Sequence, residues 1–250
     1  MKRDEIVHWL DTYLETSRFR DLSLNGLQVE GPAEVNKVAV AVDSSMSTFE
    51  QAAEVGADML IVHHGLFWGQ PLAITGAHAR RVRYLLEQGV SLYASHLPLD
   101  AHREVGNNWG LARILGMADL EPFGDSDEIP IGVRGTFPNP LTLRELADIL
   151  EKELGESVLV HAGGKPEVGS LGIISGAAAR EVTTAAELGL DAFLTGEPKH
   201  ETFYDAFENK INALFAGHYM TETVGVSLLA DKLEREFGLA TEFILLPTGL

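Results

Sequence analysis

The stretch VNKVAVAVDSSMSTFEQAAEVGADMLIVHHG, residues 35–65, predicts a strand, an amphipathic helix and a second strand. Apolar runs at 35–43 and 57–65 flank the helix. Within the helix Ser47 and Glu50 have the spacing of a capping box, and Gly56 can end it. This β-α-β pattern is typical of an α/β fold.

The rest of the chain continues the same alternation. Further strands are predicted at 90–96, 171–175, 191–195, 211–217 and 241–247, and further helices at the N-terminus, 78–89, 107–116, 142–154 and up to Gly238. Residues 118–140 are rich in Pro, Gly and Asp, which indicates a junction between domains. We therefore expect one α/β domain at 1–120 plus 210–250 and a second at 121–209.

Two internal similarities suggest duplication. Residues 38–64 align without a gap on 171–197, with identities in AAEVGAD (52–58) and AAELGLD (185–191), and His64 falls opposite Glu197. Residues 91–100 align on 213–222, which pairs His96 and Asp100 with His218 and Glu222. Chance similarity between short apolar strands is the alternative explanation.

Composition limits the class of protein. The 250 residues include no cysteine, which excludes disulfides and thiol nucleophiles. No apolar run approaches the roughly 18 residues that would cross a bilayer, so no membrane partner is expected and a cytoplasmic location is predicted. The net charge of −18 disfavours nucleic acid as a partner.

Histidines and carboxylates follow three of the predicted strands. His63 and His64 end a buried strand, and they can converge if the chain turns at Gly65; two hydrogen-bonded loop histidines are the alternative. Asp100 follows the next strand.

His218 and Glu222 are four residues apart at the start of a helix, hence on one face. With His63, His64 and Asp100 they make five ligands, which suit two divalent ions. Nitrogen and oxygen ligands are compatible with zinc, manganese, iron, cobalt or nickel.

Five motifs give the chain a resemblance to a known family. SLNGLQVEG (23–31), LIVHHGLFWG (60–69), HLPLDAHREVGNNWGLARILG (96–116), DAFLTGEPKHE (191–201) and AGHYMTE (216–222) resemble the Nif-three-like, or YbgI-like, family, commonly labelled GTP cyclohydrolase 1 type 2 homologues. The resemblance implies two related α/β domains with mixed β-sheets flanked by helices, in the short form without the inserted domain. It also implies a toroidal homohexamer and a dinuclear metal site formed by the five residues above.

Other polar and aromatic residues of these motifs are weaker candidates. His96 and Glu197 are the predicted catalytic residues, His96 as a proton shuttle or substrate contact, with structural hydrogen bonding as the alternative. His102 could orient a metal ligand, His200 could face the metals, Asn25 and Gln28 could form polar walls, and Phe67 and Trp68 could stack on a planar base. Ordinary loop or core roles are the alternative for each.

The function predicted from the sequence is a metal-dependent hydrolase that acts on a nucleotide or related small molecule. The alternative is a non-catalytic hexameric ring that acts as a regulatory, metal-handling or single-stranded-DNA-binding protein. No P-loop motif occurs, so a nucleotide would have to be held in another way.

Overall fold

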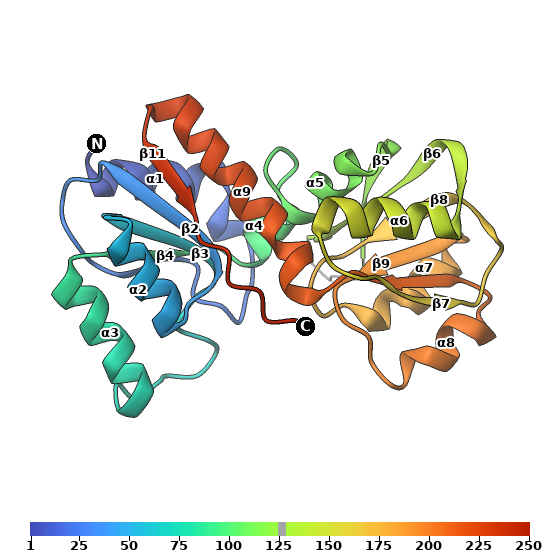
Figure 1. The fold of residues 1–250 in the computed structure, drawn as a ribbon, viewed down its shortest axis with the longest axis horizontal. Coiled ribbons are helices and arrows are strands. Elements are labelled where there is room, and N and C mark those ends of the chain that lie inside the picture. Colours follow the sequence, from blue (N-terminus) through green and yellow to red (C-terminus); the bar gives the residue numbers. More distant parts are fainter. Residues whose placement is uncertain (125–128) are drawn as a thin grey trace. The chain divides into compact units, whose positions relative to one another are not determined.

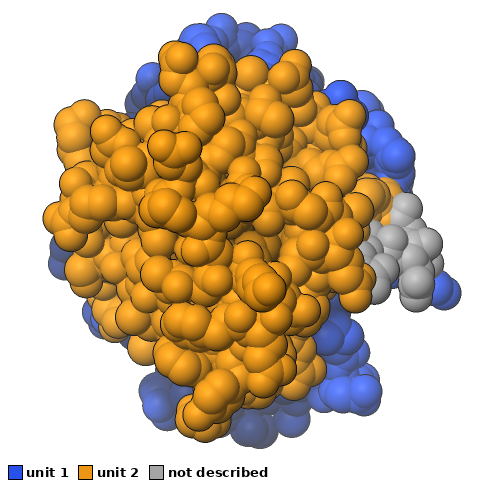
Figure 2. Space-filling model, turned by 90° about the vertical axis from the view of Figure 1, so that its right-hand side faces the viewer, with its two compact units in different colours: residues 1–105, 225–246 blue, residues 106–224, 247–250 orange. Residues whose placement is uncertain are grey.

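The computed structural model describes residues 1–124 and 129–250, which form two compact units (Figures 1 and 2). The first unit contains residues 1–105 and 225–246, and the second contains 106–224 and 247–250. The domain boundaries predicted from the sequence, 1–120 plus 210–250 and 121–209, stay a prediction about which segments fold together.

The first unit is built on a mixed sheet of five strands (Figure 1). In spatial order these are β1 (Gly26–Val29), β4 (Ser91–Ala94), β3 (Met59–His64), β2 (Lys37–Asp43) and β11 (Ala240–Phe243). Only the edge pair of β1 and β4 is antiparallel. The carboxyl ends of β2, β3 and β4 therefore lie at one edge of the sheet.

Helices cover both faces of this sheet. Alternate residues of β2, β3 and β4 pack with Phe49 and Leu85 from α2 (Met46–Glu54) and α3 (Gly76–Gln88). On the opposite face the Tyr93 hydroxyl donates a hydrogen bond of 2.8 Å to Asp11 of α1 (Arg3–Tyr13). Because side chains alternate along a strand, the apolar runs of β2 and β3 fill two cores at once.

Three further helical segments complete the first unit. They are η1 (Thr16–Arg18), α4 (Leu97–Ala101) and the C-terminal part of α9 (His218–Phe237), a helix that the two units share between Val224 and Gly225. Trp9 of α1 packs edge-on against Phe237 of α9, with ring centroids 5.1 Å apart.

The second unit is built on a mixed sheet of six strands (Figure 1). Their spatial order is β5 (Ala118–Phe123), β6 (Gly132–Thr142), β8 (Glu167–Ile173), β9 (Ala192–Thr195), β10 (Asn212–Phe215) and β7 (Leu159–Ala162). Strands β8, β9 and β10 are parallel, whereas the other pairs are antiparallel.

The helices of the second unit are α5 (Asn107–Ile114), α6 (Leu143–Leu154), η2 (Ala179–Glu181), α7 (Val182–Glu187), α8 (Thr202–Glu208) and the start of α9. Val182 and Ala206, from α7 and α8, pack with Phe193 and Phe215 of the sheet. The β8-α7-β9 unit thus has the same order and parallel pairing as β2-α2-β3.

The mixed α/β fold predicted from the sequence is confirmed, with two local corrections. Ser45, not Ser47, caps α2, and its hydroxyl accepts a hydrogen bond of 3.1 Å from the Thr48 amide. The stretch 118–140, predicted as a junction, instead supplies β5 and most of β6 in its described part. Its Gly and Pro residues obscured the strand pattern; Gly132 and Gly135 lie where a Cβ would meet backbone oxygens of neighbouring strands.

Helix α6 begins with a complete capping box. The Thr142 hydroxyl accepts a hydrogen bond of 3.2 Å from the Glu145 amide, and the Glu145 carboxylate accepts one of 2.8 Å from the Thr142 amide. Two amide donors at the helix start are thereby satisfied.

We expect Thr142→Ala to lower the free energy of unfolding by about 1 kcal/mol, because the Glu145 amide loses its acceptor. Thr142→Ser keeps the hydroxyl and should stay close to wild type. Urea denaturation of the three proteins measures the difference, and equal losses for both variants would contradict this role of the hydroxyl.

Candidate metal centre

The side chains of His63 and His64, at the carboxyl end of β3, are each oriented by an oxygen atom. Buried His63 donates from Nδ1 to the carbonyl oxygen of Ser95, at 3.0 Å. His64 Nδ1 lies 2.8 Å from Oδ1 of Asp43, the last residue of the neighbouring strand β2. The two imidazole centroids are only 4.8 Å apart, although both residues belong to the strand.

A third imidazole, that of His96, joins this pair. Its centroid lies 5.0 Å from that of His63 and 5.7 Å from that of His64. His96 Nδ1 is 2.9 Å from Oδ1 of Asp21, and its backbone amide donates to Oδ1 of Asn25 at 2.7 Å. The ring is thus held through both its side chain and its backbone.

The three hydrogen bonds determine which nitrogen of each ring carries the proton. When Nδ1 carries the proton and donates it to oxygen, Nε2 keeps a lone pair that can bind a metal ion. Each of His63, His64 and His96 offers one nitrogen, and these nitrogens lie within 4.8 Å of one another. This arrangement suits a divalent ion that prefers imidazole ligands.

Asp21 is a buried carboxylate whose hydrogen bonds converge on His96. Its side chain is 2% exposed, and it accepts hydrogen bonds from the amides of Ser23 and Leu97 and from Nδ2 of Asn25. Burial alone would raise the pKa of Asp21, but the hydrogen bond and charge of His96, with the Asn25 and Ser23 donors, outweigh it and lower the pKa to about 2.

Asp100 adds a carboxylate to the same unit. It lies in α4, one helical turn after His96, and is 5% exposed. Its Oδ2 is 3.6 Å from Nε2 of His63. The four predicted residues of this unit, His63, His64, His96 and Asp100, are therefore brought together.

In the second unit, His218 and Glu222 lie on one face at the start of α9. His218 Nε2 is 3.2 Å from Oε1 of Glu222, and His218 Nδ1 is 3.5 Å from Oε2 of Glu197. The hydrogen bond and charge of Glu222, followed by those of Glu197, raise the pKa of His218 to about 9, although burial opposes the rise. The helical spacing predicted from the sequence thus produces a direct contact.

Gly176 makes room for this His–carboxylate pair. It has a φ of +67°, and a Cβ there would clash with Oε1 of Glu222 and lie 3.3 Å from Nε2 of His218. The Gly176 amide donates to the Thr221 hydroxyl at 3.1 Å, which ties the loop to α9. Any larger residue would displace the carboxylate.

Two other predicted residues, His102 and Gln28, have structural roles, and a third is exposed. His102 donates from Nε2 to the Tyr13 carbonyl oxygen at 3.0 Å and accepts hydrogen bonds from backbone amides at Nδ1. The ring thus stabilises the end of α1 rather than orienting a metal ligand. Gln28 accepts the Leu66 amide at 2.7 Å and packs where Gly65 has no side chain. His200 is exposed in the loop before α8.

Asp21 and Asp43, which orient His96 and His64, were not predicted from the sequence. Asp43 ends the strand VAVAVD beside β3, so its position at the same sheet edge was a usable signal. Asp21 lies in an irregular segment, where no periodic pattern marks it. Asn25, predicted as a polar wall, is found to hold the His96 backbone.

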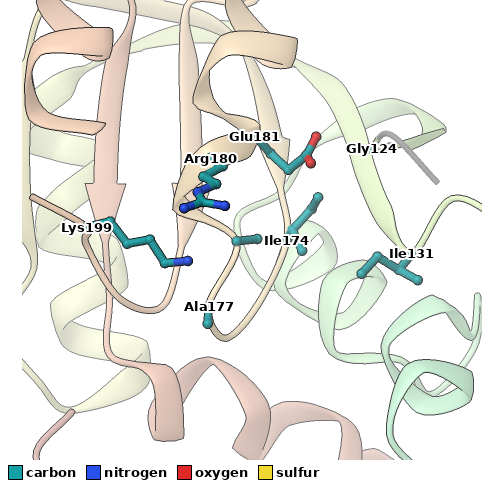
Figure 3. A pocket seen from close by; sticks show the side chains of 8 residues that line it. Gly124, Ile131, Ile174, Ala177, Arg180, Glu181 and Lys199 are labelled. Carbon is teal, nitrogen blue, oxygen red and sulfur yellow. The ribbon is translucent and has the colours of Figure 1, made fainter. Parts of the chain in front are cut away.

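A separate pocket of about 180 Å³ lies in the second unit (Figure 3). Ile131 and Ile174 give it apolar walls, and Arg180, Glu181 and Lys199 place charges around it. Arg180 also pairs with Glu201 at 3.2 Å. Of the described charged residues that line the pocket, Arg180 and Lys199 are cationic and Glu181 is acidic.

Three oriented imidazoles and a carboxylate lie together at one edge of the sheet in the first unit. With its two mixed α/β units, the chain therefore falls in a class of candidate metal-binding proteins. The chain belongs to the Duf34/NIF3 (NGG1p interacting factor 3) family, whose model matches residues 1–248. This confirms the family resemblance identified from the five motifs.

None of the helices in the described ranges, 1–124 and 129–250, is long and apolar enough to cross a membrane.

Similar proteins cover the whole chain. A protein of Deinococcus radiodurans named GTP cyclohydrolase 1 type 2 homolog is 52% identical over 248 residues, which are 99% of this chain and 94% of that protein. A protein of the same name from Pyrococcus horikoshii is 45% identical over the full length of both. The structure of TTHA1606 from Thermus thermophilus is similar, with a TM-score of 0.92 and 47% sequence identity. The structure of the protein ybgI, described as of unknown function, has a TM-score of 0.94 and 34% sequence identity. Each match covers 100% of both chains.

We expect Asp21→Asn to reduce the free energy of unfolding at pH 7 by about 2 kcal/mol, since a pKa lowered from 3.8 to about 2 represents that much stabilisation of the carboxylate. The folded-state pKa is below the unfolded value, so this stabilisation is full above pH 3.8 and is lost as the pH falls through about 2.

Urea denaturation of metal-free protein at several pH values between 7 and 3 tests this. The two proteins should approach each other in stability toward the acid end. Asp148→Asn, which removes an exposed ion pair with Arg144, is the matched control and should cost no more than about 0.5 kcal/mol. An Asp21→Asn protein as stable as that control would contradict the assigned role.

Proposed function

We propose that the chain binds two divalent metal ions and uses them to hydrolyse a nucleotide or a related small molecule. The observation that carries the proposal is that the proposed ligands His63 and His64 each offer a nitrogen within 4.8 Å of the other and of a nitrogen of His96, the residue proposed to transfer protons. The proposed ligands are the five residues predicted from the sequence: His63, His64, Asp100, His218 and Glu222.

The orientation of the imidazoles supports a metal role over a purely structural one. A histidine that only stabilises the fold needs one hydrogen-bond partner, and its second nitrogen can face water or a nonpolar contact. Here Asp43, Asp21 and the Ser95 carbonyl engage Nδ1 of three neighbouring rings. Oxygen atoms behind metal-bound histidines serve this purpose in other metalloproteins, where they fix the tautomer and strengthen the ligand.

Two bound divalent ions would supply a Lewis acid and lower the pKa of water in the site. The residues of the chain would position and protonate the substrate. His96, with Asp21 at Nδ1, can accept a proton at Nε2 and return it to a leaving group, since the carboxylate stabilises the imidazolium form. Glu197, beside Nδ1 of His218, would orient that ring.

The names of the relatives guide the choice of substrate. Relatives that include one 52% identical to this chain are named GTP cyclohydrolase 1 type 2 homolog, which makes GTP the first compound to test. The resemblance also leads us to propose a homohexameric ring in the cytoplasm, measurable in its assembly state by light scattering. The net charge of −18 argues against a nucleic-acid partner.

The test compares metal-free protein with protein loaded with zinc or manganese, on GTP and on a panel of phosphoesters. We expect turnover only with metal, and a loss of at least about a hundredfold in Asp100→Asn, because a neutral amide is a poor ligand for these ions. The variant should keep its circular dichroism spectrum and oligomeric mass.

Two outcomes would contradict the catalytic proposal. Absence of turnover on every compound with metal bound would favour a non-catalytic ring. Failure of Asp100→Asn to fold or assemble would indicate a structural metal instead.

Gly176→Ala tests the proposed ligand pair of Glu222 and His218 without changing either residue. We expect at least about a tenfold loss of zinc affinity, because a Cβ at this position would displace the Glu222 carboxylate.

Gly155→Ala is the matched control. Gly155 also has a positive φ, +75°, but a Cβ there would meet nothing within 4 Å. Both variants should lose about 1 kcal/mol of stability from backbone strain, and only Gly176→Ala should lose zinc affinity by calorimetric titration. Equal zinc affinities in the two variants would argue that Glu222 does not bind metal.

A further inference from the structure

Trp68 lies beside the imidazole group and is held in a fixed orientation. Its indole Nε1 donates a hydrogen bond of 2.8 Å to the carbonyl oxygen of Gly65, directly after β3. Its backbone pairs with that of Ser23 in an isolated antiparallel bridge. These contacts position the indole from both the side chain and the main chain.

The indole contacts two of the three imidazoles. Its ring centroid is 5.0 Å from that of His96, with the planes at 72°, and 5.9 Å from that of His64. Trp68 nevertheless remains 36% exposed. An exposed aromatic ring is thus fixed at the border of the candidate metal centre.

Two exposed leucines extend this apolar surface. Leu22 is 74% exposed and Leu24 is 55% exposed. The Leu22 carbonyl accepts the Gly69 amide at 2.6 Å, and the Leu24 amide donates to the Phe67 carbonyl at 3.0 Å, so both segments are tied together around Trp68. We call Leu22, Leu24 and Trp68 the apolar shelf.

The shelf adjoins the segment that orients His96. Asp21 and Asn25 flank the two leucines in sequence, and both hold His96 by hydrogen bonds. One short segment, residues 21–25, therefore supplies the shelf and positions the imidazole. A molecule that reaches His96 would meet the shelf as well.

We propose that the apolar shelf binds the planar nitrogen heterocycle of the substrate by stacking on Trp68. The proposal rests on the proposed function, because it names the class of compound that the metal centre would act on. The donor of the indole is already used by Gly65, so the shelf offers a π-surface and methyl groups but no hydrogen bond. Stacking of a base on an aromatic side chain suits that surface, whereas a phosphate group needs donors or positive charge that the three shelf side chains lack.

Zinc-loaded protein titrated with guanosine monophosphate and with ribose 5-phosphate tests the shelf by calorimetry, without any turnover. The two probes share sugar and phosphate and differ in the base. We expect wild type to bind the nucleotide at least about tenfold more tightly, since one stacked base contributes this much or more. Trp68→Leu should weaken nucleotide binding about tenfold and leave ribose 5-phosphate unchanged, while Trp68→Phe keeps most of the affinity.

Leu24→Asn and Leu86→Asn form a matched pair that does not alter the indole. Both leucines belong to the first unit and are exposed to a similar extent, 55% and 57%, but Leu86 lies on α3 outside the shelf. Only Leu24→Asn should weaken binding of the nucleotide. Thermal denaturation and zinc titration of each variant confirm an intact fold and metal site.

Equal affinities of wild type and Trp68→Leu for guanosine monophosphate would overturn the shelf, as would the absence of measurable binding at millimolar concentration. A change of oligomeric mass in Trp68→Leu without a change in nucleotide affinity would show instead that a second copy covers this surface. Each result is separable from failure of the proposed function, which the metal-dependent turnover assay measures independently.

Discussion

The candidate centre depends on the hydrogen bond that each imidazole makes through Nδ1. A histidine ring can rotate and exchange its proton between two nitrogens, so proximity alone does not create a ligand set. The Ser95 carbonyl and the Asp43 carboxylate remove this freedom for His63 and His64. The oxygen atoms behind the rings therefore determine which nitrogens face one another.

Asp21 shows what this orientation requires of the fold. Burying a carboxylate is unfavourable unless donors surround it, and four donors do so here: His96, Asn25 and the amides of Ser23 and Leu97. The irregular segment before β1 therefore folds around a charge. Its path then leaves Leu22 and Leu24 exposed beside the candidate centre.

The sequence was sufficient for much of the fold because its periodic patterns are strong. The apolar runs of β2 and β3 and the helix predicted at 142–154 each follow from local sequence patterns, and all were found where predicted. Strands β5 and β6 were missed because their glycines, which permit close strand packing, and their prolines together resemble a linker.

The candidate site was predictable to a smaller extent. Adjacent histidines at a strand end, and a His–Glu pair four residues apart, can be recognised in the sequence itself. The pairing of Asp21 with His96 joins residues 75 positions apart through an irregular segment, and no local rule predicts that contact. Residues that orient a ligand are harder to find than the ligand because tertiary structure alone brings them together.

The shared helix α9 has a consequence for biosynthesis. The chain leaves the first unit after Val105, forms most of the second, and returns through α9 to add β11 beside β2, about two hundred residues upstream. During translation the central strands of the first sheet emerge early, but the edge of β2 stays unpaired until β11, about two hundred residues later, has been synthesised. An unpaired strand edge can template pairing with another chain, so the late arrival of β11 leaves nascent β2 open to aggregation while the intervening residues are synthesised.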